Sequence, residues 1–230
     1  MTGSISRARY VGALALLSFV SGTALPQDRV PSRIELPTVN VGDSWTYHQV
    51  DGYTGIKSPP YVNVVTSVSE QEIRIQTNRN KGAVASTLFN RNFNRLVIER
   101  GGRKAIADPY YPMYSFPLKM GKTWEQKVTI TGTAQSNPKR DVTLTGKVLG
   151  WEQVTVPAGT FNALKIEVSG PYHQQAFKTR QRWYDGWQTD TLWYVPEVKN
   201  VVKRTYVDII TNHGPRANEV HELLEYKLSP

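Results

Sequence analysis

Three basic side chains alternate along one segment of the chain, at Lys178, Arg180 and Arg182. In an extended strand this spacing places the three cations on one face, where they could receive a phosphate or a carboxylate. The same row is also typical of a solvated outer face, or of an edge strand that positive charge protects from pairing. We favour the solvated face or protected edge and keep the anion-binding face as the alternative.

Residues that could bind metal or perform catalysis are present but are not grouped. The histidines stand far apart, without the spacing of metal ligands, at His48, His173, His213 and His221. The sequence has no Gly-x-Ser-x-Gly elbow, no phosphate loop and no close pair of carboxylates in an apolar setting. Glu152 and Asp208 would have raised pKa values if buried, although salt-bridged or edge-exposed carboxylates are more common. We therefore expect no metal, no cofactor and no enzymatic activity.

Aromatic side chains are a better basis for binding. The pair Asp185-Gly186 is typical of a turn, and a turn there would place a large ring at a loop tip, where it could contact sugar or lipid. The candidate binding residues around this pair are Trp183, Tyr184, Trp187 and Trp193. The alternative is that these rings, with a second aromatic group in residues 110–116, cap the sheet and fill the mouth of a barrel.

The elements that must position these side chains are β-strands. Apolar and polar residues alternate with period two after residue 40, whereas helical spacing is almost absent. Turn pairs such as Asp51-Gly52 and Gly101-Gly102 separate the alternating segments. The pattern predicts an all-β protein of roughly ten to thirteen strands, arranged as a single large curved antiparallel sheet or an open half-barrel.

A short motif occurs twice, as Val41-Gly42-Asp43-Ser44-Trp45 and as Met120-Gly121-Lys122-Thr123-Trp124. In both copies a glycine turn leads into a strand that begins with tryptophan. The repeat predicts two similar meanders, in residues 37–116 and 117–228, that form one continuous sheet. The residues predicted to line the concave face of this sheet are Trp45, Trp124, Val128 and Ile130.

The first residues have the features of an export signal. Arg7 and Arg9 precede an apolar run of about ten residues, and small residues lead to Ala24. The run is too short to span a membrane, which requires about 20 residues. We expect cleavage of residues 1–24 and a mature domain in residues 25–230 that has no transmembrane segment; a short buried helix at residues 1–24 is the alternative.

The absence of cysteine and the net charge of +9 limit where such a domain could act. Without cysteine there is no disulfide and no lipidated residue after the signal, so we expect a soluble periplasmic protein. A basic exported protein is attracted to anionic envelope surfaces, although a merely well-solvated surface is the favoured interpretation. Nucleic acid is not an expected partner, because export removes the protein from it.

Several motifs together resemble an exported Gram-negative family known only as a domain of unknown function. They are the Gly-x-[Ser/Thr]-Trp opening, Val156-Pro157-Ala158-Gly159-Thr160-Phe161 and Trp193-Tyr194-Val195-Pro196-Glu197-Val198. The resemblance covers most of residues 117–228. It implies a periplasmic, sheet-dominated fold that is similar to the half-barrel of lipoprotein carriers, and it implies no catalytic residues.

These observations lead to one functional hypothesis with two alternatives. We expect a non-enzymatic periplasmic binding or envelope-associated protein that holds an apolar or lipid-like ligand on the concave face of the sheet. The first alternative is an interaction module that docks on a partner protein by an edge strand or by the basic face. An enzyme acting on envelope carbohydrate is the third and least favoured interpretation.

Overall fold

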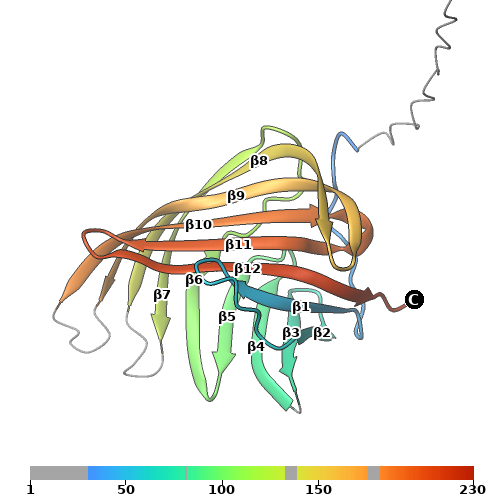
Figure 1. Ribbon diagram of the computed structural model, residues 1–230, viewed down its shortest axis with the longest axis horizontal. Coiled ribbons are helices and arrows are strands. Elements are labelled where there is room, and N and C mark those ends of the chain that lie inside the picture. The colour runs from blue at the N-terminus through green and yellow to red at the C-terminus, as the bar shows by residue number, and fades with distance from the viewer. Residues whose placement is uncertain (1–30, 81, 133–138, 176–181) are drawn as a thin grey trace, which may run out of the picture.

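The computed structural model describes residues 31–230 except residues 81, 133–138 and 176–181 (Figure 1). The predicted signal peptide, residues 1–24, lies outside the described residues. So do Lys178 and Arg180 of the predicted basic face.

The described chain forms twelve strands and one short 3-10 helix. The first six strands are β1 Ser44–Asp51, β2 Tyr61–Val68, β3 Glu72–Arg79, β4 Gly82–Asn90, β5 Arg95–Arg100 and β6 Arg103–Tyr111. The other elements are β7 Thr123–Gly132, β8 Arg140–Val156, β9 Gly159–Gln175, β10 Trp183–Val195, the helix η1 Pro196–Val198, β11 Asn200–Ile210 and β12 Gly214–Lys227.

All twelve described strands belong to one antiparallel sheet in which each strand pairs with its neighbours in the sequence. The predicted all-β class and single curved sheet are confirmed. The predicted open half-barrel is wrong, because β1 pairs with β12 along its whole length and with β2 at residues 44–47, which closes the barrel. Alternation along a strand shows which residues share a face, but it does not show whether the first and last strands meet.

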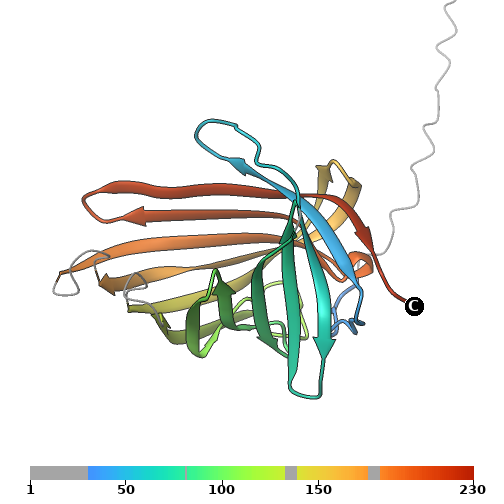
Figure 2. The same ribbon diagram turned by 90° about the horizontal axis from the view of Figure 1, so that it is seen from below.

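The two halves of the barrel differ in strand length. The strands β8 and β9 each have 17 residues, whereas β1, β2 and β3 each have 8. The long strands β8–β12 therefore extend beyond the short strands on one side of the molecule (Figures 1 and 2). The short strands β2–β5 lie below the long strands in the view of Figure 1, and the interior described below lies between these two parts of the sheet.

The strand β7 shows how the alternating pattern places side chains. Trp124, Val128 and Ile130 share one face of β7 and pack in or against the core, whereas Glu125 and Lys127 on the other face are exposed. Val128 lies opposite Val142 of β8, and both are buried. The shared face that the sequence predicted for Trp124, Val128 and Ile130 is confirmed.

The predicted turn at Asp185-Gly186 is wrong, because both residues lie inside the continuous strand β10. Gly186 is required for another reason. A Cβ atom at this position would overlap the ring carbon and hydroxyl of Tyr172 on the neighbouring strand β9. The glycine therefore makes room for a buried aromatic ring and does not reverse the chain.

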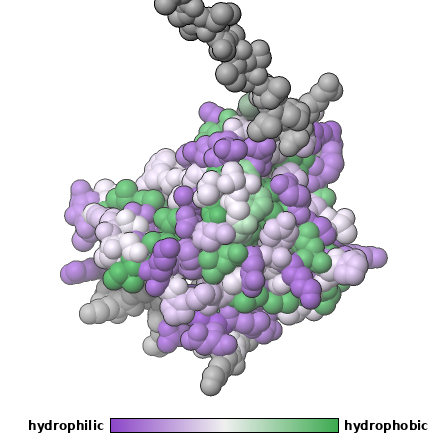
Figure 3. All heavy atoms as spheres, turned by 45° about the vertical axis from the view of Figure 1, so that its right-hand side comes forward, coloured by the Kyte–Doolittle hydropathy of each residue, from purple (hydrophilic) through white to green (hydrophobic). Residues whose placement is uncertain are grey.

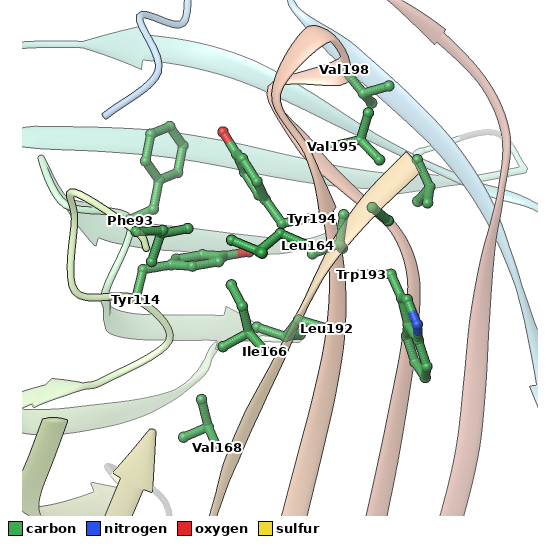
Figure 4. Packing of buried hydrophobic residues seen from close by; sticks show 14 of the residues in the cluster. Phe93, Tyr114, Leu164, Ile166, Val168, Leu192, Trp193, Tyr194, Val195 and Val198 are labelled. Atoms are coloured by element: carbon green, nitrogen blue, oxygen red, sulfur yellow. The ribbon is translucent and has the colours of Figure 1, made fainter. Parts of the chain in front are cut away.

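The hydrophobic core lies inside the barrel, mainly against the long strands. Leu192 and Tyr194 of β10 point into it and pack near Phe93 and Tyr114, whereas Trp193 points to the opposite side of the strand (Figure 4). Apolar patches also occur on the outside, where they are interspersed with hydrophilic ones (Figure 3).

Candidate functional site

The barrel interior holds a cavity of about 180 Å³, which we call the deep cavity. Much of its wall is aromatic or aliphatic, and it includes the second aromatic segment that the sequence analysis singled out. The apolar lining residues include Ile75, Phe89, Phe93, Met113, Tyr114, Phe116, Leu192 and Tyr194. The rings of Tyr114 and Phe116 lie 5.4 Å apart, and both pack edge-on against Tyr194. This wall is suited to an acyl chain or another apolar group.

A second cavity, of about 570 Å³, adjoins the first and has a polar wall. We call it the outer cavity. It is lined by Gln49, Tyr61, Asn63, Thr77, Arg79, Val84, Arg100, Gly101, Arg204, Glu219 and His221. Its volume falls within the range of about 300–1,000 Å³ that is usual for small-molecule sites. The two cavities share five lining residues, which are Tyr61, Asn63, Thr77, Arg204 and His221. We call these five residues the neck.

Hydrogen bonds fix the side chains of the neck. The Tyr61 hydroxyl lies 2.7 Å from His221 Nδ1, and Thr77 Oγ1 donates a hydrogen bond of 2.8 Å to Asn63 Oδ1. Burial raises the pKa of the Tyr61 hydroxyl to about 12, so this hydroxyl keeps its proton at neutral pH. The neck therefore offers fixed polar groups between an apolar and a polar compartment.

Arg204 of the neck is held by a buried carboxylate. Its Nε and Nη2 atoms donate to the two oxygens of Asp190 at 2.6 and 2.7 Å, and Asp190 is completely buried. Burial of Arg204 works against its charge, but the ion pair with Asp190 outweighs this effect and raises the pKa of Arg204. Arg204 therefore keeps its charge inside the barrel.

A second network surrounds Asp208, which is 2% exposed. Arg140 donates to Asp208 Oδ2 at 3.0 Å, and the Tyr172 hydroxyl donates to Oδ1 at 2.6 Å. Arg140 also donates to Gln188 Oε1 at 2.6 Å, and its guanidinium stacks on the Tyr172 ring. Both buried aspartates are thus paired with arginine, so neither is a free acid or base.

Two polar atoms inside the barrel have no hydrogen-bond partner among the described residues. They are the Tyr194 hydroxyl in the wall of the deep cavity and Arg79 Nε in the wall of the outer one. Burial of an unpaired polar group is costly, so such groups are uncommon unless a ligand or water satisfies them.

The repeated tryptophans are anchors of the fold. Trp45 is completely buried and its Nε1 donates to the carbonyl of Val198 at 2.8 Å, while Trp124 Nε1 donates to the carbonyl of Pro112 at 3.1 Å. Trp45, Trp124 and Ile130 are not among the residues that line either interior cavity, and neither is Val128, which borders a groove of about 690 Å³.

The predicted aromatic cluster is divided between the two faces of β10. Tyr184 faces the interior, where its hydroxyl accepts a hydrogen bond from Gln174. Trp183 and Trp187 are 38% and 49% exposed. Trp183 stacks on His173 at 4.5 Å, and Trp187 borders the same groove as Val128. The structure does not bring these rings together at one loop tip.

Trp193 is covered on the outer face of the barrel. The Nζ atoms of Lys165 and Lys203 lie 5.1 and 5.7 Å from its ring centre, and its Nε1 donates to Glu152. Partial burial raises the pKa of Glu152, but the hydrogen bonds from Trp193 and Lys165 outweigh it and lower this pKa. Burial, the condition on which a raised pKa was expected for Glu152, is therefore not met, and Glu152 is a salt-bridged carboxylate on the outer face.

Of the predicted basic face, Arg182 is described, and it lies exposed immediately before β10. The cations that face the interior are others, and sequence analysis missed them: Arg79, Arg95, Arg140 and Arg204. A signal was present for two of their partners. Strict alternation through Leu192, Asp190 and Gln188 would have placed the polar side chains of Asp190 and Gln188, which bind Arg204 and Arg140, on the core face of β10.

In the described part of the chain, no group of His, Asp or Glu side chains is arranged to hold a metal ion. Within the same residues, no helix has the length and apolar character that crossing a membrane requires.

No protein-family model matches this chain, and no curated protein matches it significantly. Among solved structures it is similar to a candidate lipoprotein from Parabacteroides distasonis, with 15% identity, a TM-score of 0.47 and coverage of 84% of this chain and 99% of the other. A candidate exported protein with a YmcC-like fold from Bacteroides fragilis matches with 14% identity and a TM-score of 0.49, over 85% of this chain and 99% of that one.

The hypothetical lipoprotein YmcC from Escherichia coli matches with 13% identity and a TM-score of 0.45, over 82% of this chain and 85% of that one. At this level of similarity, neither function nor location is transferred to this chain.

Proposed function

We propose that this protein is a non-enzymatic binding protein that holds an amphipathic small molecule inside its barrel. The apolar part of the ligand packs against the apolar wall of the deep cavity, and its polar part contacts the polar and charged side chains that line the two cavities. The observation that carries this proposal is the neck, because five shared residues join an apolar compartment to a polar one. At about 25 cal/mol per Å² of buried apolar area, a short acyl chain is enough for measurable affinity.

The state of the two buried aspartates in the interior supports binding over catalysis. Asp190 and Asp208 are both ion-paired with arginine, whereas a glycosidase requires one carboxyl to donate a proton and another to act as base or nucleophile. Docking by an edge strand, the alternative from the sequence, finds little support, because every described strand of the closed sheet has a neighbour on both sides.

A substitution that fills the deep cavity tests the proposal. Thr87 lines this cavity, and Thr87→Phe would place a ring in it, whereas Thr145 of β8 is exposed and Thr145→Phe serves as the matched control. Titration of delipidated protein with a fluorescent fatty acid should give saturable binding that Thr87→Phe weakens by about tenfold or more and that Thr145→Phe leaves unchanged.

Equal weakening in the two variants would place the probe outside the cavity. Absence of saturable binding to the wild-type protein by any amphipathic probe would reject the proposed function.

We further propose that the protein acts in the periplasm after removal of residues 1–24. The basic residues Arg7 and Arg9, the apolar run that follows and the small residues before Ala24 support this proposal. The intact mass of protein recovered from a periplasmic extract tests it. A species that retains residues 1–24 and fractionates with membranes would reject it.

A further inference from the structure

The cations of the deep cavity are not equally paired. Arg95, Lys199 and Arg204 line this cavity, and the described residues that line it include no aspartate or glutamate. Arg204 is paired with Asp190, and Lys199 Nζ lies 3.7 Å from Asp43. Arg95 is different, because among the described residues no carboxylate lies within ion-pair distance of it.

The surroundings of Arg95 are aromatic and cationic. Its guanidinium lies 4.2 Å from the centre of the Tyr111 ring, and its strand neighbours include Phe89 of β4. Burial lowers the pKa of Arg95, and the charge of Arg204 adds to this effect. Asp190 also attracts Arg95, but both carboxylate oxygens of Asp190 already accept hydrogen bonds from Arg204.

The guanidinium of Arg95 has donors that can pair with an anion. Arginine stays charged even when it is desolvated, and it presents a planar set of donors that matches a carboxylate or phosphate. Cation–π contact with Tyr111 covers one face of the guanidinium and leaves its edge donors available. The Tyr194 hydroxyl, which also has no partner among the described residues, lines the same cavity and can supply a further hydrogen bond.

We propose that the ligand is an anionic amphiphile whose carboxylate or phosphate group pairs with Arg95 inside the barrel. This inference rests on the proposed function, and it adds the charge of the ligand and the residue that recognises it. A neutral amphiphile would leave Arg95 without an ionic partner in the occupied cavity, and this difference provides the selectivity.

Three probes of equal chain length separate the possibilities: dodecanoate, dodecyl phosphate and dodecanol. At about pH 8 the carboxylate and the phosphate are ionised, while the alcohol is neutral. We expect wild-type protein to bind at least one of the two anions about tenfold or more tightly than dodecanol. The anion that binds more tightly identifies the headgroup chemistry.

Substitution of Arg95 tests whether this residue causes the preference for anionic probes over dodecanol. Arg95→Met removes the charge and retains an apolar stem, and it should reduce the preference for the anion to about twofold or less. The exposed Arg103 provides a control of equal charge change, and Arg103→Met should retain the preference. Arg95→Lys keeps a charge at the site and should retain part of the preference, which distinguishes lost recognition from a distorted cavity.

The outcomes separate the two proposals. Equal binding of all three probes by wild-type protein overturns the anionic ligand and leaves the binding protein in place, whereas binding of none rejects the proposed function itself. The comparison of the two anions with dodecanol uses wild-type protein alone. It therefore decides whether the ligand is anionic even if Arg95→Met does not fold. A preference that persists in folded Arg95→Met assigns recognition to other residues and contradicts the role of Arg95.

Discussion

The indole ring of Trp124 lies where a side chain at position 146 would have to lie. Trp124 and Gly146 are opposite each other on β7 and β8, and a Cβ atom on Gly146 would overlap Cε2 and Cζ2 of the indole. The tryptophan of the second repeat motif therefore depends on a glycine more than twenty residues further along the chain.

Gly146→Ala should destabilise the protein by about 1–3 kcal/mol, because the added methyl group forces Trp124 out of its position. Gly82→Ala is the matched control, since nothing lies within 4 Å of a Cβ atom at Gly82. Urea denaturation of both variants measures the difference. Similar midpoints for the two would contradict the packing of Trp124 on Gly146.

The sequence predicts a great deal about the strands but less about their arrangement. Alternation placed Trp124, Val128 and Ile130 on one face, because the side chains of a strand must alternate. Closure of the barrel depends on the sum of twist and bend over all strands, and no single segment encodes that sum. Asp185-Gly186 was misinterpreted because a glycine is needed both in turns and beside a large ring.

The candidate site was harder to predict, because its cations come from four separate strands. Arg79, Arg95, Arg140 and Arg204 lie on β3, β5, β8 and β11. Each stands next to residues that look equally suited to a solvated face, and Arg204 directly follows Lys203, which points outward to Glu222. Only the register of the whole barrel decides which of two adjacent cations faces inward.

Truncation of the two repeated tryptophans should have unequal effects. Trp45→Ala removes a completely buried ring and should cost about 3–5 kcal/mol of unfolding free energy, whereas Trp124→Ala, which removes a partly exposed ring, should cost less. Trp187→Ala should change stability by about 0.5 kcal/mol or less, because its ring is 49% exposed. Chemical denaturation checks all three, and a large effect of Trp187→Ala would show that its ring packs more than its exposure indicates.

Removal of the charge on Asp190 should be strongly destabilising. Asp190→Asn leaves Arg204 without its ionic partner inside the barrel, and breaking a buried pair in this way costs about 3–5 kcal/mol. The double variant Asp190→Leu with Arg204→Met removes both charges and should recover most of that loss. Thermal and urea unfolding of the wild type and both variants measure these differences in stability. If Asp190→Asn unfolded like the wild type, the pair would not hold the barrel together.

The ion pair on the outer face predicts a pH dependence. Because the pKa of Glu152 is lower in the folded protein, its contribution to stability is present above the unfolded value of about 4.3 and is lost as the pH falls through the folded value. The stability difference between wild type and Glu152→Gln should therefore be largest near neutral pH and shrink in acid. Glu125→Gln provides the control, since it removes the same charge from an exposed carboxylate that has no ion pair among the described residues. A difference that is independent of pH would contradict the assignment.

The strand ladders that close the barrel are of very unequal length. β1 meets β2 along residues 44–47 and β6 meets β7 along residues 105–108, whereas β8 and β9 pair from residue 140 to residue 156. The strands β2–β6 therefore form a panel between two short ladders, and this panel carries Arg79, Arg95, Phe89 and Phe93. Short ladders open at a lower free energy than long ones. A molecule held in the interior can thus exchange by a local parting of this panel, at a rate that is not limited by unfolding of the long strands.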